Sequence, residues 1–362
     1  MTQETSNTAR KRVLSGMRPT GKLHLGNYMG ALKNWVSLQH QYECYFFIAD
    51  YHALTTDYAD TSCLKQNVSE VVLDFLAAGL DPSVCTIFRQ SRVPAHFALN
   101  DLLAMITPLS WLERVPTYKD QQEQLREKDL ATIGFLGYPL LQSADILLYQ
   151  PEFVPVGQDQ AAHVEITREI ARRFNHLYGA KRSAAIASAK SDKERLAELE
   201  QQEDVREILP EPKVLLTPSP KLPGTDGRKM SKSYGNTILL SDPEPELRAK
   251  LKTMVTDPAR VRRTDPGDPE KCPVFDLHKV FSPPEVQAEA AQGCRTAGIG
   301  CIQCKGWVAD AIVAELAPIQ ERRSHFEANP AQVASILDDG AQRANARAAV
   351  TMNQVYAAVN LE

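Results

Sequence analysis

The sequence predicts an α/β fold, in which a doubly wound parallel sheet is followed by an all-α region. Two observations predict this class. Short, continuous apolar runs such as Tyr45–Ala49 are typical of parallel strands that are buried on both faces, and they alternate with helical segments. After Asp242 the strand signals fade, and the rest of the chain shows only the periodicity of amphipathic helices.

The elements of the sheet can be placed in chain order. Val13–Gly16 is the first expected strand, and the turn that starts at Met17 leads into a helix ending near Gln39. The second strand, Tyr45–Ala49, is followed at once by polar residues, as expected where a parallel strand ends at a ligand crevice. The remaining predicted elements are a helix at Cys63–Ala78, a strand at Thr86–Phe88, helices at Leu99–Met105 and Leu140–Leu148, a strand at Phe153–Val156, a helix with Ala162, Ile166, Ile170 and Phe174 on one face, and a strand at Val214–Leu216.

Composition places the chain among ordinary globular proteins. Its 362 residues are 43% hydrophobic and 24% charged, which suits about two domains. No apolar run approaches the roughly 18 residues of a membrane span, and Met1–Arg12 lacks the apolar centre of a signal peptide, so we expect a soluble, cytoplasmic protein with no membrane partner. The net charge of −4 means that any polyanion must meet a local basic patch.

The loop Gly227–Asn236 is the strongest candidate for phosphate binding. Lys229 and Lys232 lie three residues apart, Ser231 and Ser233 add hydroxyls, and glycines flank the loop, so that it could close on a polyphosphate. The alternative is a solvated basic turn.

A second candidate loop, Pro19–Asn27, follows the first predicted strand. Its glycines allow close backbone approach, His24 offers a ring donor, and the following helix presents unpaired amides to an anion. Alone, this segment could equally be a strand-to-helix turn with a hydrogen-bonded histidine.

Together the two loops resemble the HIGH and KMSKS motifs of class I aminoacyl-tRNA synthetases, with HLGN at 24–27 in place of HIGH. Within that class the chain is most similar to the bacterial-type tryptophanyl-tRNA synthetase family. It departs from the family pattern at Gln158, where Glu is more frequent, and in a long insertion at about 180–212. The blocks that carry the resemblance are SGMRPTGKLHLGNYMGAL, FFIADYHALTT, YPLLQSADILLY, VPVGQDQAAHVEITREIARRFN, KLPGTDGRKMSKSYGN and MVTDPARVRR.

The resemblance implies activation of L-tryptophan by ATP and Mg²⁺ to the adenylate, followed by transfer to tRNA(Trp), by a protein that is a homodimer. His24, Asn27, Lys229 and Lys232 would hold the phosphates and serve as the catalytic residues. The residues implied for ATP binding are Arg18, Pro19, Thr20, Gly26, Asn27, Gly157, Gln158, Asp159, Leu222, Lys229, Met230, Ser231, Lys232 and Ser233.

Choice of the amino acid is expected at Asp145, a carboxylate inside an apolar helical run. Burying it is costly unless a group donates to it, and an indole N–H is a donor with no acceptor capacity. The alternative is a helix-face Asp that is satisfied by a neighbouring backbone group or Arg. The other residues implied for the tryptophan pocket are Leu14, His52, Tyr138, Gln142, Val154, Val156 and Gln160.

Three other functions stay open. Tyr138, Gln142 and Asp145 also resemble the hydroxyl-binding pattern of tyrosyl-tRNA synthetases, although the GxDQxxH pattern at 157–163 resembles the tryptophan family. A nucleotidylyltransferase uses a similar loop on this fold but would not need a helical domain. A non-catalytic RNA-binding paralogue is disfavoured by the intact Lys229 and Lys232.

Four of the seven cysteines, which an intracellular chain should keep reduced, suggest a metal site. Cys272, Cys294, Cys301 and Cys304 are separated by 21, 6 and 2 residues, and four thiolates suit either zinc or an iron–sulfur cluster. The arrangement resembles the [4Fe–4S] site of one branch of the family. The other three cysteines lie in apolar contexts and suggest burial.

Three arginines, Arg260, Arg262 and Arg263, suit contact with the tRNA phosphate backbone, with a solvated charged segment as the alternative. The expected domains are a disordered tail at 1–11, a Rossmann-type catalytic domain at 12–240 with the charged helical insertion at about 180–212, and a helical anticodon-recognition domain at 241–362 that carries the cysteines.

Overall fold

The computed structural model describes residues 10–115, 130–179, 207–216 and 221–361. Most of the predicted tail at 1–11 and of the insertion at 180–212 lies outside the described residues. Within the described ranges, no helix is long and apolar enough to cross a membrane.

The predicted parallel sheet is confirmed. Five strands pair in the order β3-β2-β1-β4-β5, and every pair is parallel. The order reverses between β1 and β4, which is the point where ligand crevices form at the carboxyl ends of such sheets. The strands are β1 (Arg12–Met17), β2 (Glu43–Ile48), β3 (Thr86–Arg89), β4 (Phe153–Val156) and β5 (Lys213–Leu216).

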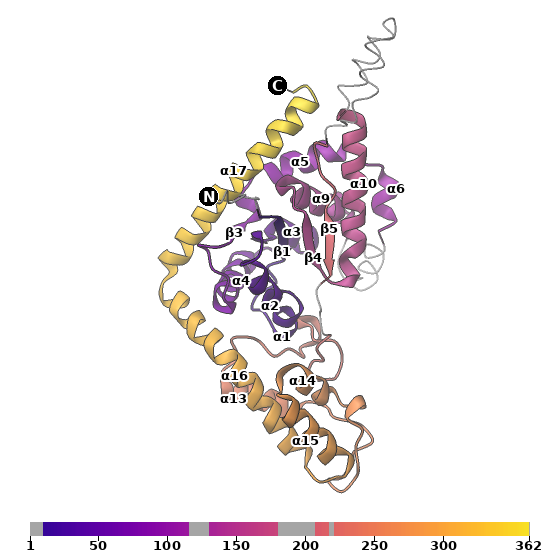
Figure 1. The fold of residues 1–362 in the computed structure, drawn as a ribbon, viewed down its shortest axis with the longest axis vertical. Helices are drawn as coiled ribbons and strands as arrows, with labels where there is room; N and C mark the ends of the chain where they lie inside the picture. Colours follow the sequence, from indigo (N-terminus) through magenta and orange to yellow (C-terminus); the bar gives the residue numbers. More distant parts are fainter. Residues whose placement is uncertain (1–9, 116–129, 180–206, 217–220, 362) are drawn as a thin grey trace, which may run out of the picture.

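Helices cover both faces of the sheet (Figure 1). The α-helices are α1 (Leu25–Asn27), α2 (Lys33–Leu38), α3 (Asp50–Asp57), α4 (Leu64–Ala78), α5 (Ala95–Ala104), α6 (Leu109–Glu113), α8 (Ile133–Leu136), α9 (Tyr138–Tyr149), α10 (Ala161–Tyr178), α13 (Glu244–Thr253), α14 (Pro273–Phe281), α15 (Pro284–Arg295), α16 (Cys301–Ala328) and α17 (Pro330–Ala358). A π-helix, η1 (Tyr28–Leu32), joins α1 to α2, and the 3-10 helices are η2 (Gln90–Arg92), η3 (Gln158–Gln160), η4 (Lys232–Tyr234) and η5 (Pro269–Lys271).

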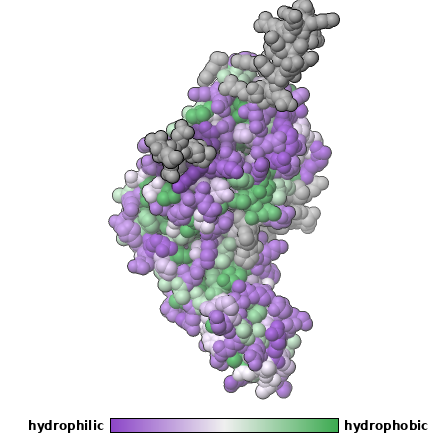
Figure 2. Space-filling view, viewed as in Figure 1, coloured by the Kyte–Doolittle hydropathy of each residue, from purple (hydrophilic) through white to green (hydrophobic). Residues whose placement is uncertain are grey.

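The two faces of the sheet form two hydrophobic cores. Because successive strand residues point to opposite faces, Val13 and Phe46 enter the core beneath α2 and α4, while Leu14 and Phe47 enter the core beneath α5, α9 and α10. Nearly every residue of α9 is buried, which accounts for its continuous apolar sequence. Figure 2 shows hydrophilic side chains over most of the visible face, with hydrophobic ones confined to smaller areas between them.

The C-terminal region is helical in every described element after β5, in agreement with the sequence. Helices α13, α14, α15 and the start of α16 lie at the lower end of the molecule (Figure 1). Helix α16 then runs to α4, where Arg323 forms ion pairs with the buried Asp74 and with Glu70. Helix α17 continues beyond α16 along the sheet and packs against β3 (Figure 1).

Helix α17 approaches β3 so closely that only glycine fits at position 340. A Cβ built on Gly340 would lie 1.8 Å from the carbonyl oxygen of Ile87. The helix therefore covers the outer strand of the sheet, where an uncovered edge would be open to pairing with other chains.

This contact predicts a position-dependent effect of adding one methyl group. Gly340→Ala should lower the free energy of unfolding by about 3 kcal/mol, because the new methyl must displace backbone rather than a flexible side chain. In Gly306→Ala, the matched control within α16, the added Cβ meets nothing within 4 Å and should stabilise the helix by up to about 1 kcal/mol. Urea unfolding of the two variants checks the prediction, and equal midpoints would contradict it.

Candidate active site

A cavity of about 350 Å³ opens at the carboxyl ends of β1 and β4. Its volume falls in the range of small-molecule sites, roughly 300–1,000 Å³. All eight residues predicted for the amino-acid pocket line it: Leu14, His52, Tyr138, Gln142, Asp145, Val154, Val156 and Gln160. The predicted nucleotide residues Arg18 and Gly157 line its rim as well.

Aromatic side chains pack closely around this cavity. Gly16, at the end of β1, faces the Phe47 ring, which a Cβ at that position would meet at 2.4 Å. The rings of Tyr138 and His163, which also line the cavity, stack with centroids 5.5 Å apart. His163 Nδ1 lies 2.6 Å from Gln142 Oε1 and donates to it, since an amide oxygen can only accept.

Asp145 is fully buried and receives three hydrogen bonds from protein side chains. Gln90 Nε2 and His96 Nδ1 lie 2.7 and 2.6 Å from Oδ1, and His52 Nε2 lies 2.9 Å from Oδ2. Burial would raise the pKa of Asp145, but the two histidines outweigh that effect and hold the pKa below its usual value.

Sequence reasoning missed two of these donors. Gln90 and His96 are completely buried, in η2 and in α5 respectively. His96 is a single polar residue in a mainly apolar stretch, which is a signal that could have identified it, because a buried polar group needs a partner. Gln90 lies in a polar run directly after a strand and carries no such signal.

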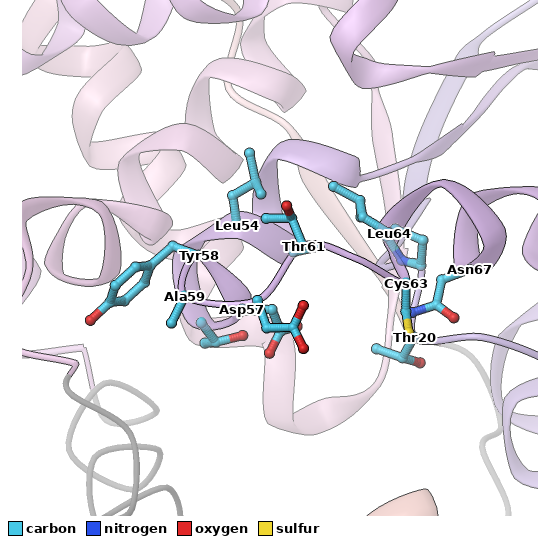
Figure 3. A pocket seen from close by; sticks show the side chains of 13 residues that line it. Thr20, Leu54, Asp57, Tyr58, Ala59, Thr61, Cys63, Leu64 and Asn67 are labelled. Carbon is cyan, nitrogen blue, oxygen red and sulfur yellow. The ribbon is translucent and has the colours of Figure 1, made fainter.

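A second cavity, of about 580 Å³, lies beyond the turn at Pro19 and Thr20. Thr20, Asp57, Cys63 and Asn67 lie around this space, between the end of α3 and the start of α4 (Figure 3). Arg18 stands between the two cavities, where its guanidinium forms an ion pair of 3.5 Å with Asp57 and a hydrogen bond to Thr56.

The two predicted phosphate-binding loops meet in space. Leu25 N donates to Ile238 O and Leu240 N donates to Leu23 O, both at 2.9 Å, so the segment that follows the lysine loop pairs antiparallel with the segment around His24. Asp74 Oδ2 accepts from Leu23 N at 2.6 Å and fixes the first of these segments to α4.

The lysine loop is shaped by a buried asparagine. Asn236 Nδ2 donates to Asp226 Oδ1 at 2.6 Å and to Lys229 O at 3.2 Å, while its Oδ1 accepts from Ser231 N at 2.8 Å. The loop therefore has a defined conformation, unlike a freely solvated basic turn.

Lys232 points from this loop to the other. Its Nζ lies 2.7 Å from Thr20 O and 3.3 Å from Thr20 Oγ1. Burial lowers the pKa of Lys232 to about 8, against the raising effect of the more distant Asp74 and Glu70. Lys229 is exposed, and its charge reaches His24.

His24 is neutral and has a defined tautomer. Burial, together with Lys232 and Lys229, lowers the pKa of His24 to about 4. Its Nδ1 accepts from Asn27 N at 3.3 Å while Asn27 Oδ1 accepts from His24 N at 3.1 Å, a reciprocal cap on α1. The remaining ring proton is therefore on Nε2, where it can be donated to an anion.

The other residues predicted for the nucleotide fall into three groups. Gly26 lies against the His24 ring and Met230, and the side chains of Leu222 and Met230 belong to the hydrophobic core, where Met230 N donates to Leu222 O. Gln158 and Ser233 are exposed. The side chain of Asp159 lies outside what the structure describes.

The three predicted tRNA-binding arginines are in different environments. Arg260 is buried, and its guanidinium donates to Ile299 O and Arg263 O, so it braces the backbone. Arg262 and Arg263 are exposed beside a third cavity of about 610 Å³, which the first turn of α16 also lines.

The four C-terminal cysteines gather in one place, at the starts of α14 and α16 and the end of α15. Burial and the other three thiols raise the pKa of Cys304 to about 12. Within the described residues, however, no group of three or more His, Cys, Asp or Glu side chains is arranged to hold a metal ion. The structure thus brings the predicted ligands together without forming the predicted metal site.

Comparison with known proteins connects this geometry to a family. The family model described as tRNA synthetases class I (W and Y) matches residues 6–317. The chain is 50% identical to a tryptophan–tRNA ligase of Ralstonia nicotianae, over 97% of this chain and 98% of the relative. It is 49% identical to a tryptophan–tRNA ligase of Thermotoga maritima, over 97% and 99%.

Comparison with solved structures leads to the same family. The crystal structure of tryptophanyl-tRNA synthetase from Campylobacter jejuni complexed with ADP and tryptophan is 33% identical and superposes with a TM-score of 0.81, over 96% of this chain and 99% of the other. The chain belongs to the class I tRNA synthetases of the W and Y family.

Proposed function

We propose that the chain activates L-tryptophan with ATP and transfers the product to tRNA(Trp), as a tryptophan–tRNA ligase. The observation that carries the proposal is the position of the cavity with its buried carboxylate, which opens beside two joined loops bearing His24 and Lys232. The relatives of similar length and high identity carry the same name.

The reaction needs no protein nucleophile. The carboxylate oxygen of tryptophan attacks the α-phosphorus of ATP, and the bond from that phosphorus to the bridging oxygen breaks to release pyrophosphate. A terminal ribose hydroxyl of the tRNA then attacks the carbonyl carbon of the adenylate, and AMP leaves. Correct alignment of two bound reactants can contribute about 7–11 kcal/mol to such a step.

The joined loops would bind the departing pyrophosphate. Lys229 and Lys232 supply positive charge, and His24 supplies a neutral Nε2–H donor from the opposite side. A well-placed donor of this kind contributes roughly 3–4 kcal/mol to transition-state stabilisation. Mg²⁺, which binds largely through nucleotide phosphates and water, would add to this neutralisation when ATP is bound.

Amino-acid selection would rest on Asp145. Its carboxylate can accept the indole N–H, whereas phenylalanine would leave the remaining acceptor position on Oδ2 unfilled. A tyrosine hydroxyl could also use Asp145 and Gln142, so the geometry alone suits both amino acids. We choose tryptophan over tyrosine as the proposed substrate because the relatives with the highest identity given above are named tryptophan–tRNA ligases.

Amino-acid-dependent exchange between ATP and pyrophosphate tests this function. The full-length chain should exchange with tryptophan and not with tyrosine. Lys232→Ala should lower kcat by roughly 10²–10³-fold because a transition-state donor is removed. Lys271→Ala, an exposed lysine in η5, is the matched control and should retain full exchange. Exchange driven by tyrosine alone would overturn the assignment, and an absence of exchange with both would favour a nucleotidylyltransferase or a binding protein.

Two features extend the proposal to assembly and location. Large apolar side chains are exposed on α5, α6, α8 and the turn after α5, which supports a homodimer: Phe97, Met105, Leu109 and Ile133. All seven cysteines are free thiols, which supports a reducing, cytoplasmic setting.

The tRNA is proposed to contact the helical region through Arg262 and Arg263. Both guanidiniums are exposed beside the third cavity, whereas Arg260 supports the backbone beneath them. Arginine is suited to bidentate phosphate contact, and such contacts weaken as salt displaces them.

Replacing the exposed arginines should separate tRNA binding from activation. The double variant Arg262→Ala, Arg263→Ala should raise the KM for tRNA. It should also reduce the salt dependence of tRNA binding: the slope of the logarithm of the binding constant against the logarithm of the salt concentration should fall by roughly one unit for each phosphate contact that is lost. Tryptophan-dependent exchange should be unchanged. Arg295→Ala, an exposed arginine on α15 that does not line the cavity, should leave both activities intact. Equal reduction of exchange and aminoacylation would instead indicate misfolding.

The gathered thiols support a metal site as a further part of the proposal. Cys272, Cys294, Cys301 and Cys304 would be its ligands, with a [4Fe–4S] cluster as the proposed occupant and zinc as the alternative. When bound, such a group would have a structural role, because the thiols lie in the helical region away from the cavity of the catalytic sheet.

Metal analysis of protein purified without oxygen tests this part. A cluster should give about four iron and four sulfide per chain. Cys294→Ser should lose most of the iron, whereas Cys63→Ser should retain it, because Cys63 lies outside the group of four and is exposed rather than buried as its sequence context suggested. Stoichiometric zinc without iron would contradict the cluster, and protein free of both metals would contradict the site.

A further inference from the structure

The hydrogen bonds around Asp145 distinguish residues that face the cavity from residues that stand behind it. Asp145 and His52 line the cavity, whereas Gln90 and His96 do not, although both donate to the same carboxylate. Because Gln90 and His96 have no exposed surface, they do not touch a bound amino acid, and their hydrogen bonds to a cavity residue go to Asp145.

The geometry leaves Asp145 one acceptor position. A carboxylate offers about four lone-pair positions, two on each oxygen. Oδ1 already accepts from Gln90 and His96, and Oδ2 accepts from His52. Among the described hydrogen bonds the remaining position is therefore on Oδ2, the oxygen shared with the cavity residue His52.

His96 is held on both sides by α9. Its Nδ1 donates to Asp145, and its Nε2 lies 3.0 Å from the hydroxyl of Tyr149, one helical turn further along α9. Tyr149 is also completely buried. The imidazole lies beside the rings of Phe47 and Phe88, at centroid distances of 5.9 and 6.1 Å, so its orientation is fixed by packing as well as by hydrogen bonds.

We propose that His96, backed by Tyr149 and Gln90, is a positioning residue that determines amino-acid specificity, because it turns Asp145 into a pure acceptor with one lone pair aimed into the cavity. The inference deepens the proposed function and depends on tryptophan being the substrate. A site built in this way favours an aromatic side chain that donates one hydrogen bond, and it rejects an isostere without that donor.

The titratable groups around the carboxylate agree with this role. His52 approaches from α3, His96 from α5 and Tyr149 from α9, with Tyr45 of β2 beyond Tyr149. Burial and the nearby Asp145 raise the pKa of Tyr149, so the tyrosine stays a neutral hydroxyl. Removal of the His96 donor would leave the burial of Asp145 less opposed and raise the pKa of its carboxyl group.

His96→Leu tests the proposal in tryptophan-dependent pyrophosphate exchange. The variant should raise the KM for tryptophan roughly tenfold or more while kcat and the KM for ATP stay within about twofold, since the missing interaction affects binding of one substrate only. Its KM for tryptophan should also rise as the pH falls, and the rise should begin at a higher pH than in the unaltered enzyme, because the pKa of Asp145 is higher without the His96 donor.

A tryptophan analogue without the N–H donor gives a second measurement. With 3-benzothienylalanine, in which sulfur replaces the indole N–H, the unaltered enzyme should show kcat/KM lower by about 10²-fold or more than with tryptophan. In His96→Leu this ratio should shrink at least tenfold. His96→Asn, whose amide can replace the Nδ1 donor, should restore most of the discrimination.

Tyr149→Phe keeps the test decisive if His96→Leu does not fold. It removes the hydroxyl that contacts His96 and should change the KM for tryptophan and the discrimination in the same direction as His96→Leu, but by less. The control is Tyr45→Phe, which removes a hydroxyl bonded to Glu43 and should change neither quantity. Unchanged discrimination and pH dependence in folded His96→Leu or Tyr149→Phe would overturn the inference. Absence of tryptophan-dependent exchange in the unaltered enzyme would instead refute the proposed function.

Discussion

The active site depends on two backbone hydrogen bonds that join segments more than two hundred residues apart. The pairing of Leu23–Leu25 with Ile238–Leu240 brings the lysine loop to the end of β1. Each partner is also held from outside, since Asp74 accepts from Leu23 N and Gln320 on α16 donates to Leu240 O at 3.0 Å. The relative positions of His24 and Lys232 follow from this clamp, so the helical region contributes directly to the geometry of the phosphate-binding loops.

Much of the fold and of the amino-acid cavity could be predicted from the sequence. The strands of a parallel sheet are buried on both faces, so runs such as Tyr45–Ala49 are apolar throughout and easily recognised. Polar residues at the ends of such strands must face the same crevice, because parallel strands share a carboxyl edge. The remaining residues proposed around Asp145, which the family resemblance implied, line the same cavity.

Other features could not be predicted because they depend on partners distant in the sequence. The common role of Gln90 and His96 becomes visible only when η2 and α5 are placed against α9, where both side chains donate to Asp145. Arg260 and Arg262 look alike in the sequence, but only the folded chain places carbonyl groups such as Ile299 O around the Arg260 guanidinium. Nothing in the sequence around Gly340 indicates that α17 packs along the sheet and lies against the carbonyl of Ile87.

The half-buried ammonium of Lys232 has a consequence for how ligand binding must be measured. Its pKa of about 8 means that part of the population has lost the proton in mildly alkaline solution. An arriving phosphate would raise that pKa again, so complex formation takes up a fraction of a proton from the buffer, and affinity weakens as pH rises through this value. His24 is neutral throughout this pH range, so it takes up no proton when the phosphate binds. Calorimetric heats of nucleotide binding would therefore include the ionisation enthalpy of the chosen buffer.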